Sequence, residues 1–235
     1  MKSRQTGFTL VEIAIVLVII GLLLGGILKG QEMIAQAKIK NVINDMNGVS
    51  AAFNSYQDRY RALPGDDKNA TGRWTTAGLP ASAAGVADGN GVIAGLWTPA
   101  AATNETALFW HHLRLAGFIS GTGTDNPFNA VSGKMGVQTG DAASPPGAAG
   151  VLAAAFVAPA TSGPGFTSLI LCSANLPDKI AISIDAQTDD GNGQTGSVRG
   201  KDQAGVANPA LVAAAAADTY VEDGTKSYLV CRAMI

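Results

Sequence analysis

The sequence predicts an α+β protein in which one long N-terminal helix, half transmembrane and half amphipathic, packs on a C-terminal antiparallel β-sheet domain. Three observations predict this fold: an apolar run from Phe8 to Leu28, a helical stripe that continues to Tyr60, and short strand-like segments after residue 165. The chain has 235 residues, of which 47% are hydrophobic and 14% charged. This length suffices for one sizeable domain and one further element.

The apolar run is long enough to cross a membrane, because a helix rises ~1.5 Å per residue and a bilayer core is ~30 Å thick. Residues 8–28 are therefore expected to form a transmembrane helix. Glu12 is the one ionisable side chain in the run. A charge at the centre of such a helix costs ~2.5 to 3.5 kcal/mol on insertion scales and usually marks function. Its cationic partner could be Lys2, Arg4 or, after a cut behind Gly7, the amino group of Phe8.

These residues resemble a known signature. Gly7, followed by Phe8-Thr9-Leu10-Val11-Glu12 and an uninterrupted apolar run, is similar to the prepilin signature of type IV pilins and of the pseudopilins of type II secretion. The resemblance implies that residues 1–7 are a leader peptide, which prepilin peptidase removes by cutting between Gly7 and Phe8. It also implies that the new amine of Phe8 is methylated and that Glu12 is the carboxylate that steers docking of the next subunit.

The resemblance therefore implies a structural subunit of a type IV pilus-like filament. Its implied partners are further copies of the chain in a helical filament, prepilin peptidase and the inner-membrane pilus assembly machinery. Before assembly the chain would be a single-pass inner-membrane protein with its distal domain in the periplasm, and afterwards part of an extracellular pilus or a periplasmic filament. Within the family, a pseudopilin of a type II secretion system is the alternative.

Two readings outside the family stay open. Ala35-Gln36-Ala37 is a site of the kind that signal peptidase accepts, which would give a secreted binding domain. Against this reading, the apolar run exceeds the usual 7 to 15 residues of a signal peptide, and polar residues precede the site. A plain membrane-anchored domain is the other reading, and in both of them Glu12 would be incidental.

The helix is expected to continue beyond the membrane as an amphipathic segment, residues 29–63. Leu63-Pro64-Gly65 should end it, since proline and glycine terminate helices. Residues 64–235 then form the globular, β-rich domain. The apolar stripe of the amphipathic segment recurs at intervals of three and four, which indicates a helix: Ile39, Val42, Met46, Val49, Phe53, Tyr56 and Tyr60.

The globular domain contains a short predicted helix, from Glu105 to Ala116, which Asn104 can cap. The segment from Gly133 to Gly150 has the composition of a loop. Asp223-Gly224 indicates a hairpin turn between residues 218–222 and the last strand. Three segments are predicted as strands: Phe166 to Ala174, Lys179 to Asp185, in which three isoleucines alternate with other residues, and Lys226 to Ala233.

The two cysteines, Cys172 and Cys231, both lie in predicted strands of the part that the resemblance places outside the cytoplasm. An oxidising compartment favours a disulfide between them. Type IV pilins similarly carry a disulfide near the C-terminus. Two buried free thiols are the alternative.

The composition speaks against several function classes. Sixteen Lys and Arg against 18 Asp and Glu give a net charge of −2, which disfavours a nucleic-acid-binding protein. No grouping of acid, base and nucleophile suggests an enzyme, and we expect no cofactor. Asp189 and Asp190 lie in an acidic glycine loop and are candidate calcium ligands, because major pseudopilins bind calcium in a distal loop. The loop does not fit the EF-hand pattern, and turn chemistry explains it without a metal.

Overall fold

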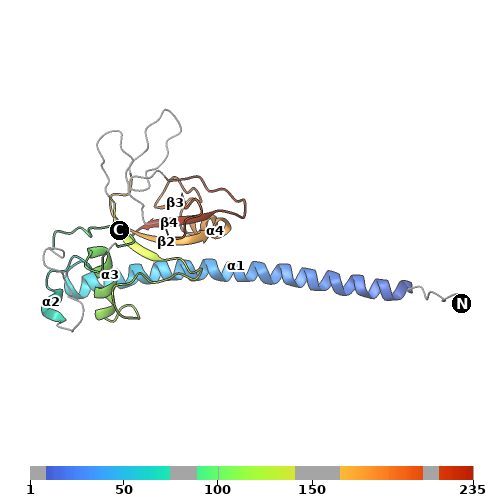
Figure 1. Cartoon of the computed structure of the whole chain (residues 1–235), viewed down its shortest axis with the longest axis horizontal. Helices are drawn as coiled ribbons and strands as arrows, with labels where there is room; N and C mark the ends of the chain where they lie inside the picture. The colour runs from blue at the N-terminus through green and yellow to red at the C-terminus, as the bar shows by residue number, and fades with distance from the viewer. Residues whose placement is uncertain (1–8, 75–88, 100, 141–164, 209–216, 235) are drawn as a thin grey trace, which may run out of the picture. The chain divides into compact units, whose positions relative to one another are not determined.

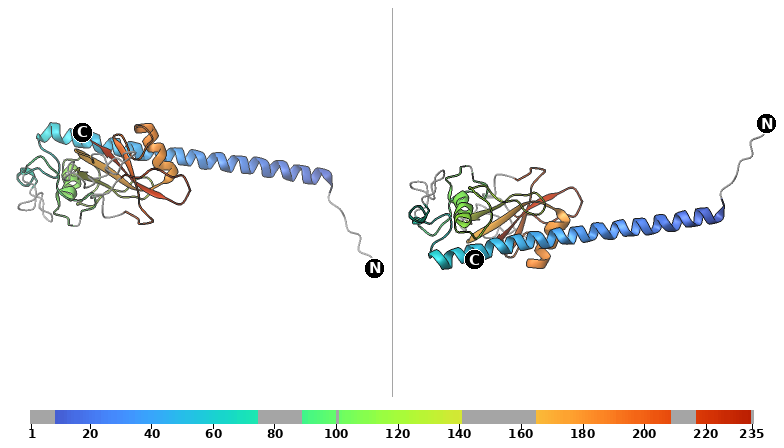
Figure 2. Two further views of the ribbon diagram at one scale, coloured as in Figure 1. Left: turned by 90° about the horizontal axis from the view of Figure 1, so that it is seen from above. Right: turned by 90° about the horizontal axis from the view of Figure 1, so that it is seen from below.

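The computed structural model describes residues 9–74, 89–99, 101–140, 165–208 and 217–234. The chain divides into two units, Met1–Lys38 and Ile39–Ile235. The predicted α+β class is confirmed, since the long helix α1, Leu10–Tyr60, is followed by a four-stranded antiparallel sheet (Figure 1). Within the second unit, both views of Figure 2 show the strands beside the final turns of α1.

The part of α1 from Ile39 to Tyr60 buries one stripe of side chains. Residues three and four apart lie on one face of a helix, so the spacing of the apolar positions decides which face is covered. The helix ends at Tyr60, three residues before Leu63, and Arg61 directly after it takes a left-handed conformation with φ of 53°. The buried residues of the stripe are Ile39, Val42, Met46, Val49, Ala52, Phe53 and Tyr56.

The sheet has the strand order β1-β2-β4-β3, with every neighbouring pair antiparallel. Its faces pack against different partners. One face shares a core with the α1 stripe, α3 and α4, and the other is covered by loop residues including Trp97 and Phe166. Both faces are thus buried, which explains why the two central strands contain apolar residues on both faces. The strands are β1, Met135–Thr139; β2, Leu169–Pro177; β3, Val198–Asp202; and β4, Ser227–Ala233.

One predicted strand is a helix. The segment from Lys179 to Asp185 lies within α4, Asp178–Thr188, which packs on β2, β3 and β4. The alternation of Ile180, Ile182 and Ile184 suggested a strand, but Ile182 is only partly buried, whereas Ala181 is fully buried. Burial therefore follows the helical period and not the period of two.

Two of the four strands were not expected from the sequence. β1 lies inside the segment predicted as a loop, and β3 was not assigned. Gly136 lowers the strand propensity of β1, yet a Cβ atom there would overlap the carbonyl oxygen of Trp97. The segment 218–222 is not a strand, so β4 has no hairpin partner there and pairs with β2 and β3 instead.

The predicted helix after Asn104 is α3, Glu105–Leu115, and a four-residue helix, α2, occupies Ala70–Arg73. Gly117 has φ of 77° and ends α3, with the N–H of Phe118 donating to the carbonyl oxygen of Leu113 at 2.9 Å. His112 on this helix is fully buried, and its Nδ1 accepts the N–H of Gly65 at 2.9 Å. The imidazole thus joins α3 to the segment that follows α1.

Candidate functional site

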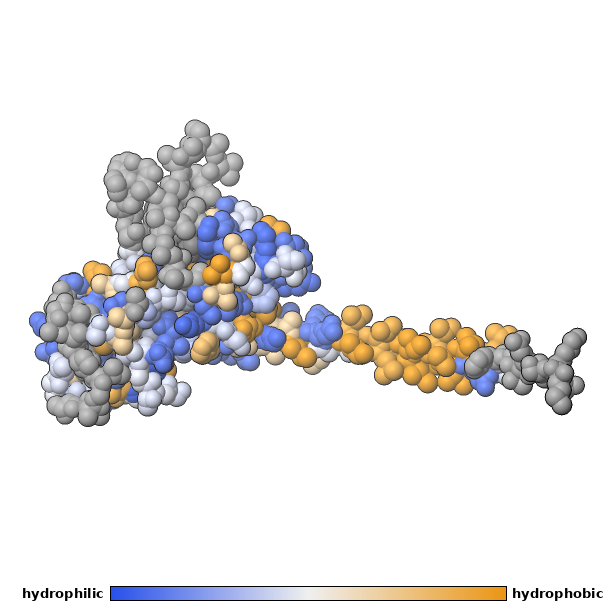
Figure 3. All heavy atoms as spheres, viewed as in Figure 1, coloured by the Kyte–Doolittle hydropathy of each residue, from blue (hydrophilic) through white to orange (hydrophobic). Residues whose placement is uncertain are grey.

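From Leu10 to Leu28, the helix of the first unit presents an apolar surface on all sides, interrupted only by Glu12. Among the described residues, α1 is the one helix long and apolar enough to cross a membrane, and its most apolar window has a mean hydropathy of 2.8 with none of it buried. Figure 3 shows this stretch as a continuous run of hydrophobic residues. Such a helix is stable only where lipid or other apolar helices replace water.

Glu12 occupies the third position of α1 and closes a capping box with Thr9. The carboxylate oxygen Oε2 of Glu12 accepts hydrogen bonds from the N–H and from the hydroxyl of Thr9, each at 2.8 Å. In return, the N–H of Glu12 donates to Oγ1 of Thr9 at 3.3 Å. The two residues thereby satisfy two backbone N–H groups that have no partner within the helix. This matters most in lipid, where no water can replace such a partner.

The capping box leaves the negative charge of Glu12 in place. Within the described part of the chain, no Lys or Arg forms an ion pair with it, and the ion pair on this unit joins Lys29 to Glu32 at 2.7 Å. A carboxylate that keeps its charge in an apolar environment requires a cation close by. Gly7 and Phe8, the residues of the predicted processing site, lie outside the described residues.

Residues 2–28 match the prokaryotic N-terminal methylation motif. This motif is the signature of type IV pilins and pseudopilins, so the resemblance predicted from Gly7 to Glu12 is confirmed. The match ends at residue 28 and does not extend to the second unit. Comparisons with curated proteins and with solved structures found no match.

The two cysteines form a disulfide between the central strands. Cys172 of β2 and Cys231 of β4 lie directly opposite each other in the sheet register, and both are fully buried. They lie on the face covered by Trp97 and Phe166. The bond encloses α4, β3 and the segment that leads to β4, so these elements form one closed loop of chain.

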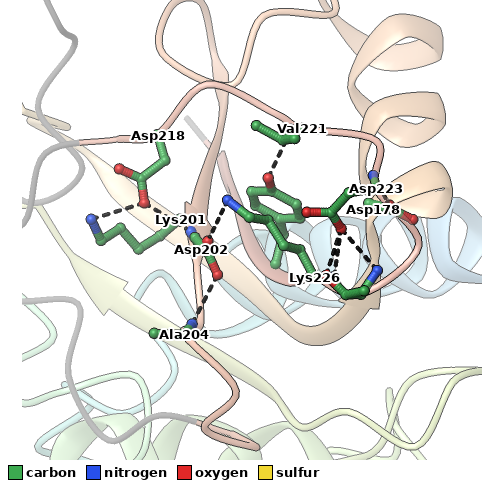
Figure 4. Close-up of polar contacts among 10 residues, drawn as sticks. Asp178, Lys201, Asp202, Ala204, Asp218, Val221, Asp223 and Lys226 are labelled. Atoms are coloured by element: carbon green, nitrogen blue, oxygen red, sulfur yellow. Dashed lines mark hydrogen bonds and ion pairs between the residues drawn. The ribbon is translucent and has the colours of Figure 1, made fainter.

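Polar contacts hold the segment before β4 onto α4 and β3 (Figure 4). Oδ2 of Asp178, in the first turn of α4, accepts the N–H groups of Asp223 at 2.8 Å and Gly224 at 2.6 Å. Two ion pairs join the same region, Lys201 with Asp218 at 2.9 Å and Lys226 with Asp202 at 3.0 Å. The Asp223-Gly224 turn predicted from the sequence is thus anchored on a helix and not on a hairpin strand.

The calcium candidates Asp189 and Asp190 lie beside Asp185, and one oxygen of each carboxylate comes within 4.8 Å of the others. Asp190 accepts the N–H of Asn192 and the hydroxyl of Thr195. Asp189 accepts the N–H of Val198 at 2.8 Å. These hydrogen bonds fix the turns after α4, as expected for Asp in turn positions.

Asp185 is the member of this group that the sequence did not reveal. It is fully buried, and it accepts the hydroxyl of Tyr220 at 2.9 Å and the N–H of Gly191 at 3.0 Å. Burial raises the pKa of Asp185 to about 6, against these two hydrogen bonds, and the nearby carboxylates of Asp189 and Asp190 raise it further. The carboxylate therefore carries an electrostatic cost at neutral pH.

The sequence analysis also did not identify the roles of Thr9 and Asp178 at helix N-termini, although the local sequence around each residue indicates a helix start. Thr9-Leu10-Val11-Glu12 has the T-x-x-E spacing of a capping box. Pro177-Asp178 places a proline and then an acidic residue at the start of α4, which is typical of a helix N-terminus. Both signals favour a helix start.

Proposed function

We propose that the chain is a structural subunit of a type IV pilus-like filament. The observation that carries this proposal is the combination of the methylation motif with an apolar helix whose Glu12 is held by Thr9 and lacks an ion-pair partner within the described chain. In the proposal, prepilin peptidase cuts after Gly7 and methylates Phe8. The helix is stored in the inner membrane, with the residues from Ile39 onward in the periplasm.

The proposed assembly step is an ion pair between two subunits. The methylated amine of Phe8 in one subunit pairs with the Glu12 carboxylate of its neighbour as the apolar helices bundle. A buried charge without a partner is far more costly among apolar side chains than a buried ion pair, so the docking register that pairs the two charges is favoured over other registers. The inner-membrane assembly machinery would then draw each subunit from the bilayer into the growing filament.

Two substitutions at Glu12 separate its charge from its capping role. Glu12→Gln keeps an oxygen that can accept the Thr9 N–H but removes the charge, because glutamine also forms capping boxes. Glu12→Ala removes both. We expect both variants to be cleaved after Gly7 and both to lose most filaments in sheared fractions from the native cell. Normal filaments from Glu12→Gln would overturn the pairing and reduce Glu12 to a helix cap.

The branch of the family is a finer proposal. A disulfide near the C-terminus and turns that do not fit the EF-hand pattern support a type IV pilin over a major pseudopilin. A pilin is expected in filaments sheared from the cell surface as well as in the membrane, whereas a pseudopilin is expected only in the periplasmic and membrane fractions. Immunodetection of the chain in the sheared material therefore distinguishes the two branches.

A further inference from the structure

Phe128 is an exposed aromatic residue in the second unit. Its side chain is 64% exposed, whereas the other exposed large apolar residues described in this unit, Val92, Val206 and Val221, are aliphatic. A single exposed apolar residue is ordinary. Phe128 differs from an ordinary exposed residue because hydrogen bonds fix the backbone around it and because it lies beside a pocket.

The backbone on both sides of Phe128 is fixed by two buried asparagines. Phe128 forms an antiparallel bridge with Lys134. Within this turn, Oδ1 of Asn129 accepts the N–H groups of Val131 and Gly133, and Nδ2 donates to Oγ of Ser173 and to the carbonyl oxygen of Ala174, all within 2.9 Å.

Asn126 provides the second anchor. Its Nδ2 donates to the carbonyl oxygens of Trp97 at 2.9 Å and Met135 at 2.8 Å. The segment from Asn126 to Asn129 is therefore tied to β1, to β2 and to the loop at Trp97. A ring presented on such a rigid segment loses little conformational entropy when it binds a ligand.

The Phe128 ring lines a cavity of about 340 Å³. Three alanines, Ala101, Ala102 and Ala107, also line it, and the remaining lining is mostly polar. This volume lies within the range of sites for small molecules, roughly 300 to 1,000 Å³. The polar residues of the lining are Thr98, Thr124, Asp125, Asn126 and Lys134.

The lining combines one aromatic face with hydrogen-bonding groups of both kinds. Asp125 supplies acceptors, Lys134 supplies donors, and the threonine hydroxyls can do either. The opposite charges of Asp125 and Lys134 favour a ligand without net charge. A pyranose ring meets these conditions, because it has a flat face of C–H groups for the aromatic ring and hydroxyls around its edge.

We propose that this pocket binds a neutral mono- or disaccharide, with Phe128 as the stacking platform and Asp125 as an acceptor for sugar hydroxyls. Every residue of this pocket belongs to the second unit. Sugar binding there does not depend on filament assembly, so the pocket can fail its test while the proposed function holds, and the reverse.

The test is saturation-transfer NMR on the full-length chain in lauryldimethylamine oxide, a detergent without a sugar headgroup. The probes are glucose, galactose, mannose, N-acetylglucosamine and lactose. We expect transfer to the C–H protons of at least one sugar. Phe128→Ala should weaken binding by roughly tenfold, which corresponds to about 1.4 kcal/mol. Phe128→Tyr keeps the ring and should retain binding, as should Val206→Ala, which removes an exposed apolar side chain elsewhere.

Two results would overturn the proposal: no transfer to any of the five sugars, and equal transfer in wild type and Phe128→Ala. If Phe128→Ala does not fold, Asp125→Ala decides in its place, because its side chain is exposed; unchanged sugar affinity in that variant would also overturn the assignment.

Discussion

Thr9 and Glu12 show how one residue pair can serve two needs of a membrane helix. The capping box satisfies backbone N–H groups at the start of α1, while the carboxylate keeps the charge that the proposed assembly step would pair with a second subunit. Because Oε2 of Glu12 accepts both bonds from Thr9, neither bond uses the second carboxylate oxygen, Oε1. An intermolecular ion pair can therefore form without breaking the cap.

Replacing Thr9 with valine is expected to loosen the start of α1. Valine has the shape of threonine but no hydroxyl, so the cap loses two of its three hydrogen bonds, at a cost of about 1 kcal/mol. Hydrogen exchange of the amides of residues 10–12, measured on the detergent-solubilised protein, should become several-fold faster. Thr9→Ser retains the hydroxyl and should exchange like wild type. Equal exchange rates in the valine variant would show that the cap does not stabilise this end.

Because Asp185 is buried, we expect its contribution to the free energy of unfolding to decrease as the pH rises. Burial raises its pKa from 3.8 to about 6 in the folded chain. Between these values the folded state binds the proton more tightly than the unfolded state does, so the contribution of Asp185 to stability is present below pH 4. It is lost as the pH rises towards 6.

Asp185→Asn should therefore stabilise the protein at pH 7 by roughly 1 to 3 kcal/mol, since one pKa unit corresponds to about 1.4 kcal/mol. The amide can still bond to Tyr220 and Gly191. Its advantage should shrink at pH 4, and urea unfolding at both pH values measures this. The same experiment with Ca²⁺ and with a chelator tests the acidic turn: an increase in wild-type stability with Ca²⁺ that Asp185→Asn abolishes would show that the three carboxylates bind the ion.

At the scale of elements, the pairing of β2 with β4 organises the sheet. The two strands run antiparallel through the centre of the order β1-β2-β4-β3, and the disulfide joins them at opposed positions. The bond closes a loop with a sequence separation of 59 residues, which includes α4 and β3. In the chain-entropy model, closing such a loop destabilises the unfolded state by ~4 kcal/mol.

The double variant Cys172→Ala, Cys231→Ala should accordingly lose about 4 kcal/mol of unfolding free energy. It should fold only if the remaining hydrophobic core is stable enough without the disulfide. Its melting temperature should not change when a reductant is added. Wild type should show a mass increase on alkylation only after reduction and unfolding. Alkylation of unreduced, unfolded wild type at both cysteines would show that the thiols are free in the native protein.

Elements with a strong local pattern could be predicted from the sequence, and others could not. The α1 stripe repeats over many turns, and β2 and β4 are apolar runs, so each carries its own signal. α4 is short, and its three alternating isoleucines imitate a strand because Ile182 lies outside the core. β1 depends on Gly136, whose fit against Trp97 is a tertiary contact that no local pattern reveals.

At the scale of the whole molecule, the two units differ in how much of their function the sequence specifies. The function proposed for the first unit rests on consecutive residues, so the roles of Gly7, Phe8 and Glu12 could be proposed from the motif alone. The second unit brings its polar groups together by folding: Asp185 meets Tyr220, and Asp178 meets Asp223, across long stretches of chain. The Phe128 pocket likewise depends on loops that only the fold brings together.

The central claim is that the chain is processed as a pilin-like subunit. The most direct test is the N-terminal sequence and intact mass of the protein from its native membrane and from sheared surface material. We expect a chain that starts at Phe8 and carries one added methyl group. A chain that keeps Met1, or one that starts at Lys38 after signal-peptidase cleavage, would contradict it and would remove the assembly role proposed for Glu12.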